Sequence, residues 1–467
     1  MAVLLFSAVK AQEKWDLLKC VEYAMANNIS IKQIDLQTRL ADLQQQQSKL
    51  SRYPSLSFNG GPSFNSGRNQ DPTSFSLITQ NYISASMQLQ SSAEIFNWFS
   101  KKNIIAANEW ELEAAKANSD KLKNDISLAV ANSYLQVLLA KSQEEIIKIQ
   151  VEQSKVQLDK TRKMVDAGSL PELNATNLEA VLASDSSAYI TARGNVTQAI
   201  LSLKAYMNFD AAAPFEVATP PAEMIPLLNI ADLQPDIVYA SAIANQPQQK
   251  LNDFKLKAAQ NNALAAKANM YPTISAYGSL GSGYNSRSEE IISSSQVVAP
   301  FANVTVNGTS YNVFPLQPFT SYTYGKTALF NQFNQNFRQS VGLNLSVPIF
   351  NGSSLRTNWE RSKINVKNLE LQKDLDNQTL KQNIYQAYNS AIVALEKFNA
   401  SRKNVSSSEL TYSFAQKRFD VGMLSNFDLV TTKNNVTSAR LEFTLNQFDY
   451  IFKMKVLEFY KGQGLKL

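Results

Sequence analysis

Two long stretches of the chain combine helical hydrophobic spacing with a complete absence of glycine and proline. The first covers residues 98–167 and ends at Gly168, and the second covers 353–421 and ends at Gly422. In the first, apolar residues recur along one helix face at Ile126, Val130, Val137, Ala140 and Ile147. A helix of this length would span about 100 Å, whereas ordinary globular helices have about 8–20 residues. We therefore predict one long helix in each stretch, which excludes an ordinary compact domain.

Shorter helices flank both long ones. We predict them at 12–53, 172–209, 248–271 and 425–461. Two of them follow a serine with an acidic residue three positions later, which is the spacing of a capping box: Ser169 with Glu172, and Ser425 with Asp428. Each long helix is therefore expected to turn at its glycine into a returning, shorter helix.

Between the helices the hydrophobic period falls to two, which indicates strands. We predict strands at 54–66, 82–97, 272–284 and 336–350. In the last of them, Val341, Leu343 and Leu345 alternate with small or polar residues. One apolar face and one small polar face are typical of a barrel wall between lipid and water. A strand of a soluble sandwich would alternate in the same way, but four such strands beside long helices favour the membrane.

The second half of the chain repeats the first, which indicates a duplication. Ile95-Phe96-Asn97 recurs as Ile349-Phe350-Asn351 at an offset of 254, and Tyr53-Pro54 recurs as Tyr271-Pro272 at an offset of 218. The difference of 36 residues (254 − 218) is an insertion between Pro272 and Phe350, and it lies in a loop that we expect to be surface-facing or mobile, 281–335. We therefore divide the chain into repeat 1, a connector with six of the 15 prolines, and repeat 2, at 12–209, 210–247 and 248–461.

The composition of the chain indicates a cellular location, but it does not indicate a strongly acidic or basic partner. The net charge of +6 is small for 467 residues, and no basic cluster is interleaved with aromatic residues, so we expect no nucleic-acid partner. Residues 1–11 have the apolar run and the small-residue end of a secretory signal remnant, which predicts export. The single cysteine, Cys20, excludes an internal disulfide, and its helical spacing favours a core position over a lipid anchor.

The residues needed for common enzyme chemistry are missing. The chain has no histidine, which removes the usual zinc sites, the Ser-His-Asp and Cys-His arrangements and most general bases. Its carboxylates are scattered over helix faces, and its glycines do not follow the pattern of a phosphate-binding loop. We therefore expect no enzyme activity, no cofactor and no metal site.

The duplicated order of helix, hairpin, long helix, glycine turn and helix resembles the outer-membrane efflux protein family, of which TolC is the archetype. The junctions Tyr53-Pro54 and Ile95-Phe96-Asn97 and the turn Phe419-Asp420-Val421-Gly422-Met423, with their copies, look like that family's motifs. The resemblance implies a mainly α fold with a membrane β-barrel, in a TolC-like trimeric duct. Four strands are too few to close a barrel, which needs about eight. The strand count alone permits two, three or more chains, and the family implies a homotrimer.

The resemblance also implies a function and a location. The chain would be a passive exit duct for small toxic molecules, drugs or polypeptides, in a tripartite efflux or type I secretion system. It would sit in outer-membrane lipid, extend into the periplasm, and dock onto a periplasmic adaptor and an inner-membrane pump. Two alternatives remain, a soluble coiled-coil scaffold and the adaptor itself, although an adaptor needs one helical hairpin and this chain has two.

Two sets of site residues follow from the resemblance. The adaptor would dock at the helix tips, formed by Ala167, Gly168, Ser169, Leu170, Val421, Gly422, Met423 and Leu424. The pore constriction would be formed by Asp428, Phe419, Asn174 and Thr431. Asp428 matches an acidic constriction position of the family, whereas the family's second acidic position is Thr431 here, which implies one weaker ring of charge. Alternatively, Asp428 only completes its capping box.

Overall fold

The computed structural model describes residues 14–70 and 75–462, so the predicted signal remnant at 1–11 lies outside the described residues. The chain forms two compact units. The helical unit takes in the chain as far as Gln45, Ala106–Gln260, and the chain from Lys363 onward. The strand unit takes in Gln46–Ile105 and Asn261–Ser362. These units cut across the sequence repeats, because each repeat contributes helices to one unit and strands to the other.

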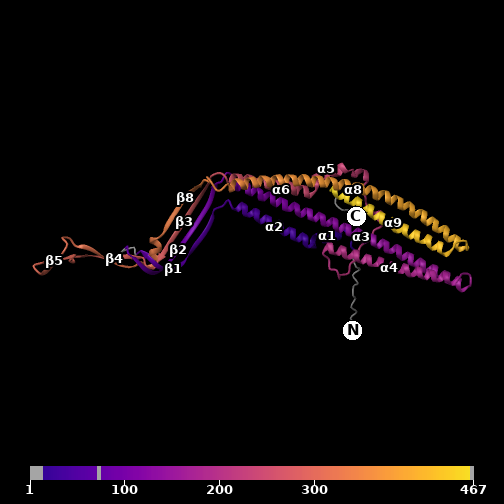
Figure 1. Ribbon diagram of the computed structural model, residues 1–467, viewed down its shortest axis with the longest axis horizontal. Coiled ribbons are helices and arrows are strands. Elements are labelled where there is room, and N and C mark those ends of the chain that lie inside the picture. The colour runs from indigo at the N-terminus through magenta and orange to yellow at the C-terminus, as the bar shows by residue number, and fades with distance from the viewer. Residues whose placement is uncertain (1–13, 71–74, 463–467) are drawn as a thin grey trace, which may run out of the picture. The chain divides into compact units, whose positions relative to one another are not determined.

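The two longest helices are α3 (Ser100–Asp166) and α8 (Ser354–Asp420), with 67 residues each, where the sequence predicted 98–167 and 353–421. α3 begins two residues later than predicted and α8 begins one residue later. The residues just before them, Trp98-Phe99 and Gly352-Ser353, have positive φ and cannot belong to a right-handed helix. The returning helices are α4 (Glu172–Met207) and α9 (Asn426–Lys461), with 36 residues each. Figure 1 shows the α3–α4 and α8–α9 hairpins within the helical unit.

The predicted helix at 12–53 is in fact two helices, α1 (Leu17–Asn27) and α2 (Ile29–Leu50). The break is at Asn28, whose backbone is extended. Its side-chain oxygen accepts from Ser30 N–H at 2.8 Å, while its amide nitrogen donates to Tyr206 C=O at 2.8 Å. One side chain therefore caps the start of α2 and satisfies a carbonyl at the end of α4. The hydrophobic period continues through the break, so the sequence pattern did not reveal it.

The connector at 210–247 is ordered against the helices. It contains two short 3₁₀ turns and a helix, namely η1 (Ala222–Met224), η2 (Ile230–Leu233) and α5 (Pro235–Asn245), and α6 (Pro247–Ala268) follows directly. Buried charged side chains bind its backbone. Lys204 donates to Ala211 C=O at 2.9 Å, and Lys455 donates to Pro226 C=O at 2.6 Å. These bonds replace the water that the lysines lose on burial.

Cys20 lies in the largest apolar core, as its spacing predicted. It is fully buried among residues of α1, α3, α4 and α9. Burial raises the pKa of its thiol to about 12, and the Asp16 carboxylate acts in the same direction. The neighbouring Tyr134 is buried too, and its hydroxyl donates to Ala218 C=O at 2.7 Å. The thiol therefore packs as a small apolar group.

The strand unit is built on a four-stranded antiparallel sheet with the order β1-β2-β3-β8. Its strands are β1 (Ser55–Gln70), β2 (Leu77–Phe96), β3 (Thr273–Asn285) and β8 (Arg338–Ser346). The register aligns Ser57, Gln90, Ser279 and Ser340 across the sheet, and the next row is Leu56, Ser91, Gly278 and Val341. One face therefore collects the polar residues and the other collects the large apolar ones, as the period-two pattern predicted.

The loop at 281–335 contains more regular structure than the expected surface-facing or mobile loop. β4 (Glu289–Val297) pairs with β7 (Phe319–Lys326), β5 (Ala302–Val306) pairs with β6 (Thr309–Val313), and α7 (Leu329–Gln335) leads into β8. The hairpin β5–β6 turns at Asn307-Gly308, where both φ angles are positive, as a two-residue hairpin turn requires. Loop length alone did not reveal these strands.

Candidate functional site

The two helix tips have the same backbone turn. Gly168 has φ +72° and Gly422 has φ +75°, and an added Cβ would meet nothing within 4 Å at either. In the first turn, Gly168 N–H donates to Val165 C=O at 2.8 Å, and Ser169 N–H donates to Met164 C=O at 2.9 Å. The corresponding bonds in the second turn measure 2.9 and 2.8 Å. This is the Schellman arrangement, in which a left-handed glycine satisfies the last helix carbonyls.

The returning helices begin differently, and one predicted capping box is wrong. Ser425 is the N-cap of α9 and accepts a hydrogen bond from Asp428 N–H at 3.1 Å. In repeat 1 the N-cap of α4 is Pro171, which makes no side-chain cap bond, so Ser169 caps nothing. The physical reason is that α4 begins only at Glu172, so Ser169 lies two residues before the N-cap, in the preceding Schellman turn. An offset of 254 aligns Pro171, rather than Ser169, with Ser425.

The predicted docking residues lie at the two turns, and most of them are exposed. In repeat 2, Val421 is 68% exposed and Met423 is 72% exposed, whereas Leu424 packs partly into the tip core. In repeat 1, Ala167, Gly168 and Ser169 are exposed and Leu170 is half-buried. The sequence analysis did not include Phe427, which is 77% exposed in the first turn of α9. Its signal was a large aromatic residue two positions after the N-cap Ser425, where an apolar side chain lacks a core to enter.

The four predicted constriction residues do not share one environment. Asp428 and Thr431 are exposed, and the Asp428 carboxylate accepts from Ser425 O–H at 2.7 Å. Asn174 is half-buried, and its backbone C=O accepts from the Asn426 side chain at 3.4 Å. Phe419 is 8% exposed and packs with Ala415 and Leu429 in the core of the second tip. Phe419 therefore supports the tip from inside, and the single chain leaves it little surface for a pore.

An ion pair joins the two hairpins near their tips. Lys160 of α3 lies 2.6 Å from the Asp420 carboxylate of α8. Both side chains are nearly half exposed, so water and salt screen this pair. Together with the bond from Asn426 to Asn174, it ties repeat 1 to repeat 2 at the end of the helical unit.

A buried polar network, which the sequence analysis did not predict, lies about three helical turns from the tip. Lys433 of α9 donates to Ser154 Oγ of α3 at 2.6 Å, and Ser154 O–H donates to the Asp185 carboxylate of α4. Gln150 completes the network by donating to Asp185 at 2.7 Å. Burial lowers the pKa of Lys433, and the Asp185 carboxylate acts in the opposite direction. A lysine between Leu429 and Val436 on the apolar stripe of α9 was the signal that could have revealed it.

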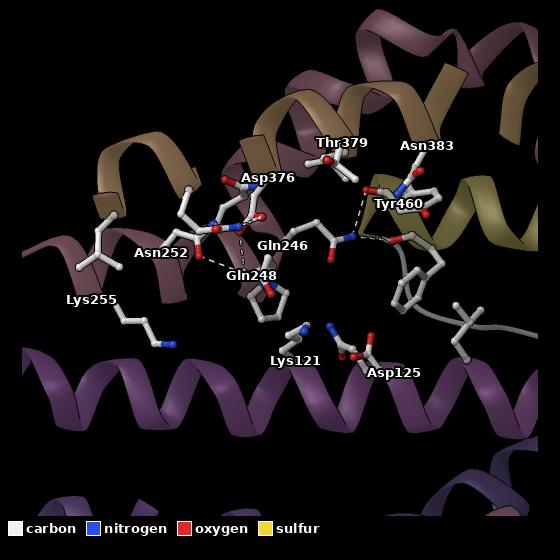
Figure 2. Close-up of a pocket in the computed structure, with 18 residues that line it drawn as sticks. Lys121, Asp125, Gln246, Gln248, Asn252, Lys255, Asp376, Thr379, Asn383 and Tyr460 are labelled. Carbon is white, nitrogen blue, oxygen red and sulfur yellow. Dashed lines mark hydrogen bonds between the residues drawn. The ribbon is translucent and has the colours of Figure 1, made fainter. Parts of the chain in front are cut away.

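A polar cavity of about 640 Å³ opens between α3, α6 and α8 at the middle of the helical unit. Figure 2 shows Lys121 and Asp125 of α3 below Gln248 and Asn252 of α6 and Asp376 of α8. The Asp376 carboxylate accepts from three amide side chains, those of Gln248, Asn252 and Gln372, at 3.2, 2.8 and 2.8 Å. Its oxygens are therefore already occupied by fixed donors, which suits a structural junction where α6 meets the end of α9.

The described residues contain neither a membrane-spanning helix nor a group of side chains suited to a metal ion. Over 14–70 and 75–462, no helix has both the length and the apolar character needed to cross a membrane. In the same residues, no cluster of three or more His, Cys, Asp or Glu side chains is placed to hold a metal ion.

Solved structures show that the fold is that of outer membrane channels. The chain superposes on CusC with a TM-score of 0.76 at 17% identity, over 95% of this chain and 91% of CusC. The CmeC outer membrane channel of Campylobacter jejuni gives 0.75 at 16% identity, over 96% and 86% of the two chains. The open MtrE channel of Neisseria gonorrhoeae gives 0.72 at 17% identity, over 96% and 88%. The predicted TolC-like fold is therefore confirmed.

Sequence relatives agree with this fold. The alkaline protease secretion protein AprF of Pseudomonas aeruginosa is 27% identical over 148 residues, which is 31% of this chain and only 30% of AprF. The sequence pattern of the outer membrane efflux protein family matches residues 21–208 and 238–451, which leaves little outside it except the termini and part of the connector. The chain belongs to the outer membrane efflux protein family.

Proposed function

We propose that the chain is one subunit of an outer-membrane exit duct, through which molecules leave the periplasm without chemical change. The observation that carries this proposal is a four-stranded sheet with an uncovered apolar face and two open edges. Family membership and the channel fold support the same role.

The apolar face of the sheet suits contact with lipid. Its large side chains are strongly exposed in the single chain, with Val341 at 91%, Leu343 at 71% and Leu56 at 70%. The opposite face carries small polar residues such as Ser57, Ser279 and Ser340, which suit a water-filled lumen. Exposed aliphatic side chains on one whole face are costly in water, so the sheet is best stabilised within the outer membrane.

The two open edges support a trimer. Among the strands of the described residues, β1 and β8 each have a neighbour on one side only. Because bare strand edges leave backbone groups unpaired, closed barrels are the form that spans membranes. Three copies of the four-stranded sheet supply twelve strands, above the minimum of about eight for a membrane barrel. In this closed ring, β8 of one subunit pairs with β1 of the next.

The helices supply the periplasmic part of the duct. Each 67-residue helix is about 100 Å long. The turns at Gly168 and Gly422 form its far end, and their exposed residues suit docking onto a periplasmic adaptor that joins the duct to an inner-membrane pump. Val421, Met423 and Phe427 offer an apolar surface there.

Near these tips, Asp428 suits a constriction. In a trimer, one exposed carboxylate per chain would form a ring of three near the axis, which attracts cations. Thr431 contributes no charge, so a single acidic ring results. Phe419 packs with Ala415 and Leu429 in the tip core, from where it would support this ring.

The cargo class has two candidates. The family description names efflux, and we take small toxic molecules or drugs as the first candidate. The name of AprF concerns secretion of a protease, which supports a polypeptide as the second candidate, although the match spans only 30% of AprF.

The experiment measures assembly and conduction together. The protein extracted from membranes with detergent should have the mass of a trimer and should form ion channels in planar bilayers. A stable monomer, or a protein that stays soluble without detergent, would instead identify a coiled-coil scaffold. Deletion of the gene, followed by a screen for compounds or proteins retained by the cells, would then decide between the two cargo classes.

A further inference from the structure

The loop that contains the 36-residue insertion includes an arm that carries no charge over most of its length. We call residues 289–326 the outer arm, with β4 and β7 as its stem and β5–β6 as its tip hairpin. From Ile291 to Gly325 the sequence contains no Asp, Glu, Lys or Arg, but it contains six aromatic residues. Figure 1 shows β4 and β5 in this part of the strand unit.

The base of the outer arm is fixed to the sheet. Gln332 of α7 is 1% exposed, and it accepts from Asn285 N–H at 2.8 Å and donates to Thr327 C=O at 3.0 Å. Ser282 of β3 also donates to Phe333 C=O at 2.7 Å. Because these bonds hold the arm at the end of β3, copies of the chain in a symmetric ring would present their arms at equivalent places.

The tip hairpin has one apolar face and one polar face. Ala302, Val304 and Val306 lie opposite Val313, Tyr311 and Thr309 on one face. The other face carries Asn303, Thr305, Ser310 and Asn312. Such strict alternation is the pattern of a hairpin that packs one face against an apolar partner.

In the single chain that face is uncovered. Val304 is 47% exposed, Val306 is 53% exposed and Tyr311 is 58% exposed. A two-stranded hairpin is only marginally stable on its own in water. The tip hairpin therefore needs a partner to stabilise it.

Strand lengths argue against membrane lipid as that partner. The 13 residues of β3 have a length of about 43 Å, so even at a tilt of about 40° they cross the apolar band of about 25 Å. The nine residues of β4 add about 30 Å of strand beyond β3. These lengths are sufficient to place the tip hairpin well outside the bilayer. The absence of charge also means that identical copies do not repel one another.

We propose that the three tip hairpins of the assembled duct pack together through these apolar faces on the threefold axis, outside the membrane. The inference rests on the proposed trimer. Three equivalent faces of a cyclic assembly can meet one another only at the axis. The tethered arms face each other at a local concentration of about millimolar, which favours a small apolar contact that free hairpins would not form. Cargo then leaves through the openings between the arm stems.

Single cysteines on the two faces test this contact. Val304→Cys, Val306→Cys and Val313→Cys lie on the apolar face, and Asn303→Cys, Thr305→Cys and Asn312→Cys are the matched controls on the polar face. The native Cys20 is buried, so the parent chain gives the background. On mild oxidation of the purified trimer, we expect a disulfide-linked dimer from two of the three subunits, formed about tenfold faster on the apolar face.

The outcomes separate this inference from the duct itself. A trimer in which the two faces cross-link equally, or neither cross-links, overturns the arm contact and leaves the duct standing. A protein that is not a trimer overturns both. A bimane fluorophore on Val304→Cys, in vesicles of brominated phosphatidylcholine, gives a third readout. Quenching by this lipid would show that the face lies in the membrane, which also overturns the contact, whereas no quenching supports it.

Discussion

At the scale of single residues, buried charges hold the helical unit in one arrangement. Lys204, Lys455 and Lys433 are each at most 7% exposed, and each donates to fixed oxygen atoms. Glu458 accepts from Leu228 N–H at 2.9 Å and pairs with Lys455 at 2.8 Å. A buried charge is tolerated only when such partners replace water, so these positions fix which helix lies beside which.

Lys433 gives the first prediction. Lys433→Met should lower the free energy of unfolding by about 3 kcal/mol, because it leaves the Asp185 carboxylate buried without its cation. The double variant Lys433→Met, Asp185→Leu should recover most of that loss. Thermal or denaturant unfolding of the four proteins in this cycle measures the coupling. If the two single variants lose the same free energy of unfolding and the double variant recovers none of it, then packing alone, and not the charge interaction, stabilises this site.

The same network predicts a pH dependence. Because burial lowers the pKa of Lys433 below its ordinary value of 10.5, the unfolded chain binds this proton more tightly than the folded chain. The stabilisation is therefore present above 10.5 and is lost as the pH falls through the lowered pKa of the folded state. The stability difference between wild type and Lys433→Met should accordingly widen as pH rises toward 10.5. A difference that stays constant over this range would contradict the lowered pKa.

Asp428 gives a prediction for conduction. Asp428→Asn should weaken block by divalent cations in planar-bilayer recordings, since the proposed ring loses its charge. Thr431→Asp should deepen the block by adding a second ring one turn along α9. The cap itself should survive in Asp428→Asn, because the backbone N–H at 428 still donates to Ser425 Oγ. Unchanged block with slightly lower thermal stability would mean that Asp428 only completes the cap.

At the scale of elements, helix ends decide the shape of each hairpin. Both long helices end at a left-handed glycine, and the open space around an added Cβ means that only backbone strain disfavours a side chain there. The starts of the returning helices differ, because Ser425 caps α9 and Pro171 precedes α4 without a side-chain cap. The two hairpins thus have the same glycine turn, but only the second is followed by a side-chain cap.

This duplication supplies a matched pair of substitutions. Gly422→Val should cost about 1–3 kcal/mol locally through strain at positive φ and should abolish efflux while the trimer yield is unchanged. Gly168→Val introduces the same strain at the other turn. Trimer yield on gels and compound accumulation in complemented deletion cells measure the two effects. A parallel loss of yield and efflux would show that Gly422 is needed only for folding.

At the scale of the whole molecule, the four-stranded sheet has two edge strands, β1 and β8, that need further copies of the chain to pair with. β1 and β8 are separated by β2 and β3, so they lie about 14 Å apart at about 4.8 Å per strand. A disulfide needs Cα atoms within about 7 Å, so cysteines on these two strands cannot join within one flat sheet. Any such link must connect two subunits.

Cross-linking at these edges therefore tests the ring. Ser57→Cys on β1, combined with a cysteine at Ser340, Gly342, Asn344 or Ser346 on β8, should give covalent trimers at one or two of these registers. Leu56→Cys is the control, because its side chain lies on the opposite face from those β8 positions. Links that form only within single chains, or at no register, would contradict the closed barrel.

The sequence by itself determined the duplication, the four long hairpin helices, the alternating strands and the glycine turns. These features are local, since hydrophobic period sets which face is apolar and a positive φ selects glycine. The tip residues were therefore predictable as positions on the chain, although their docking and gating roles stay predictions.

Only the tertiary structure decided which distant residues meet. The break at Asn28 exists because its amide reaches Tyr206, the network at Lys433 exists because three helices converge, and Phe419 is buried because α9 returns over it. The strands of the outer arm likewise depend on pairing between β4 and β7 across the insertion. Such contacts join residues far apart in sequence, and their free energy comes from burial and hydrogen bonds that periodicity along the chain does not contain.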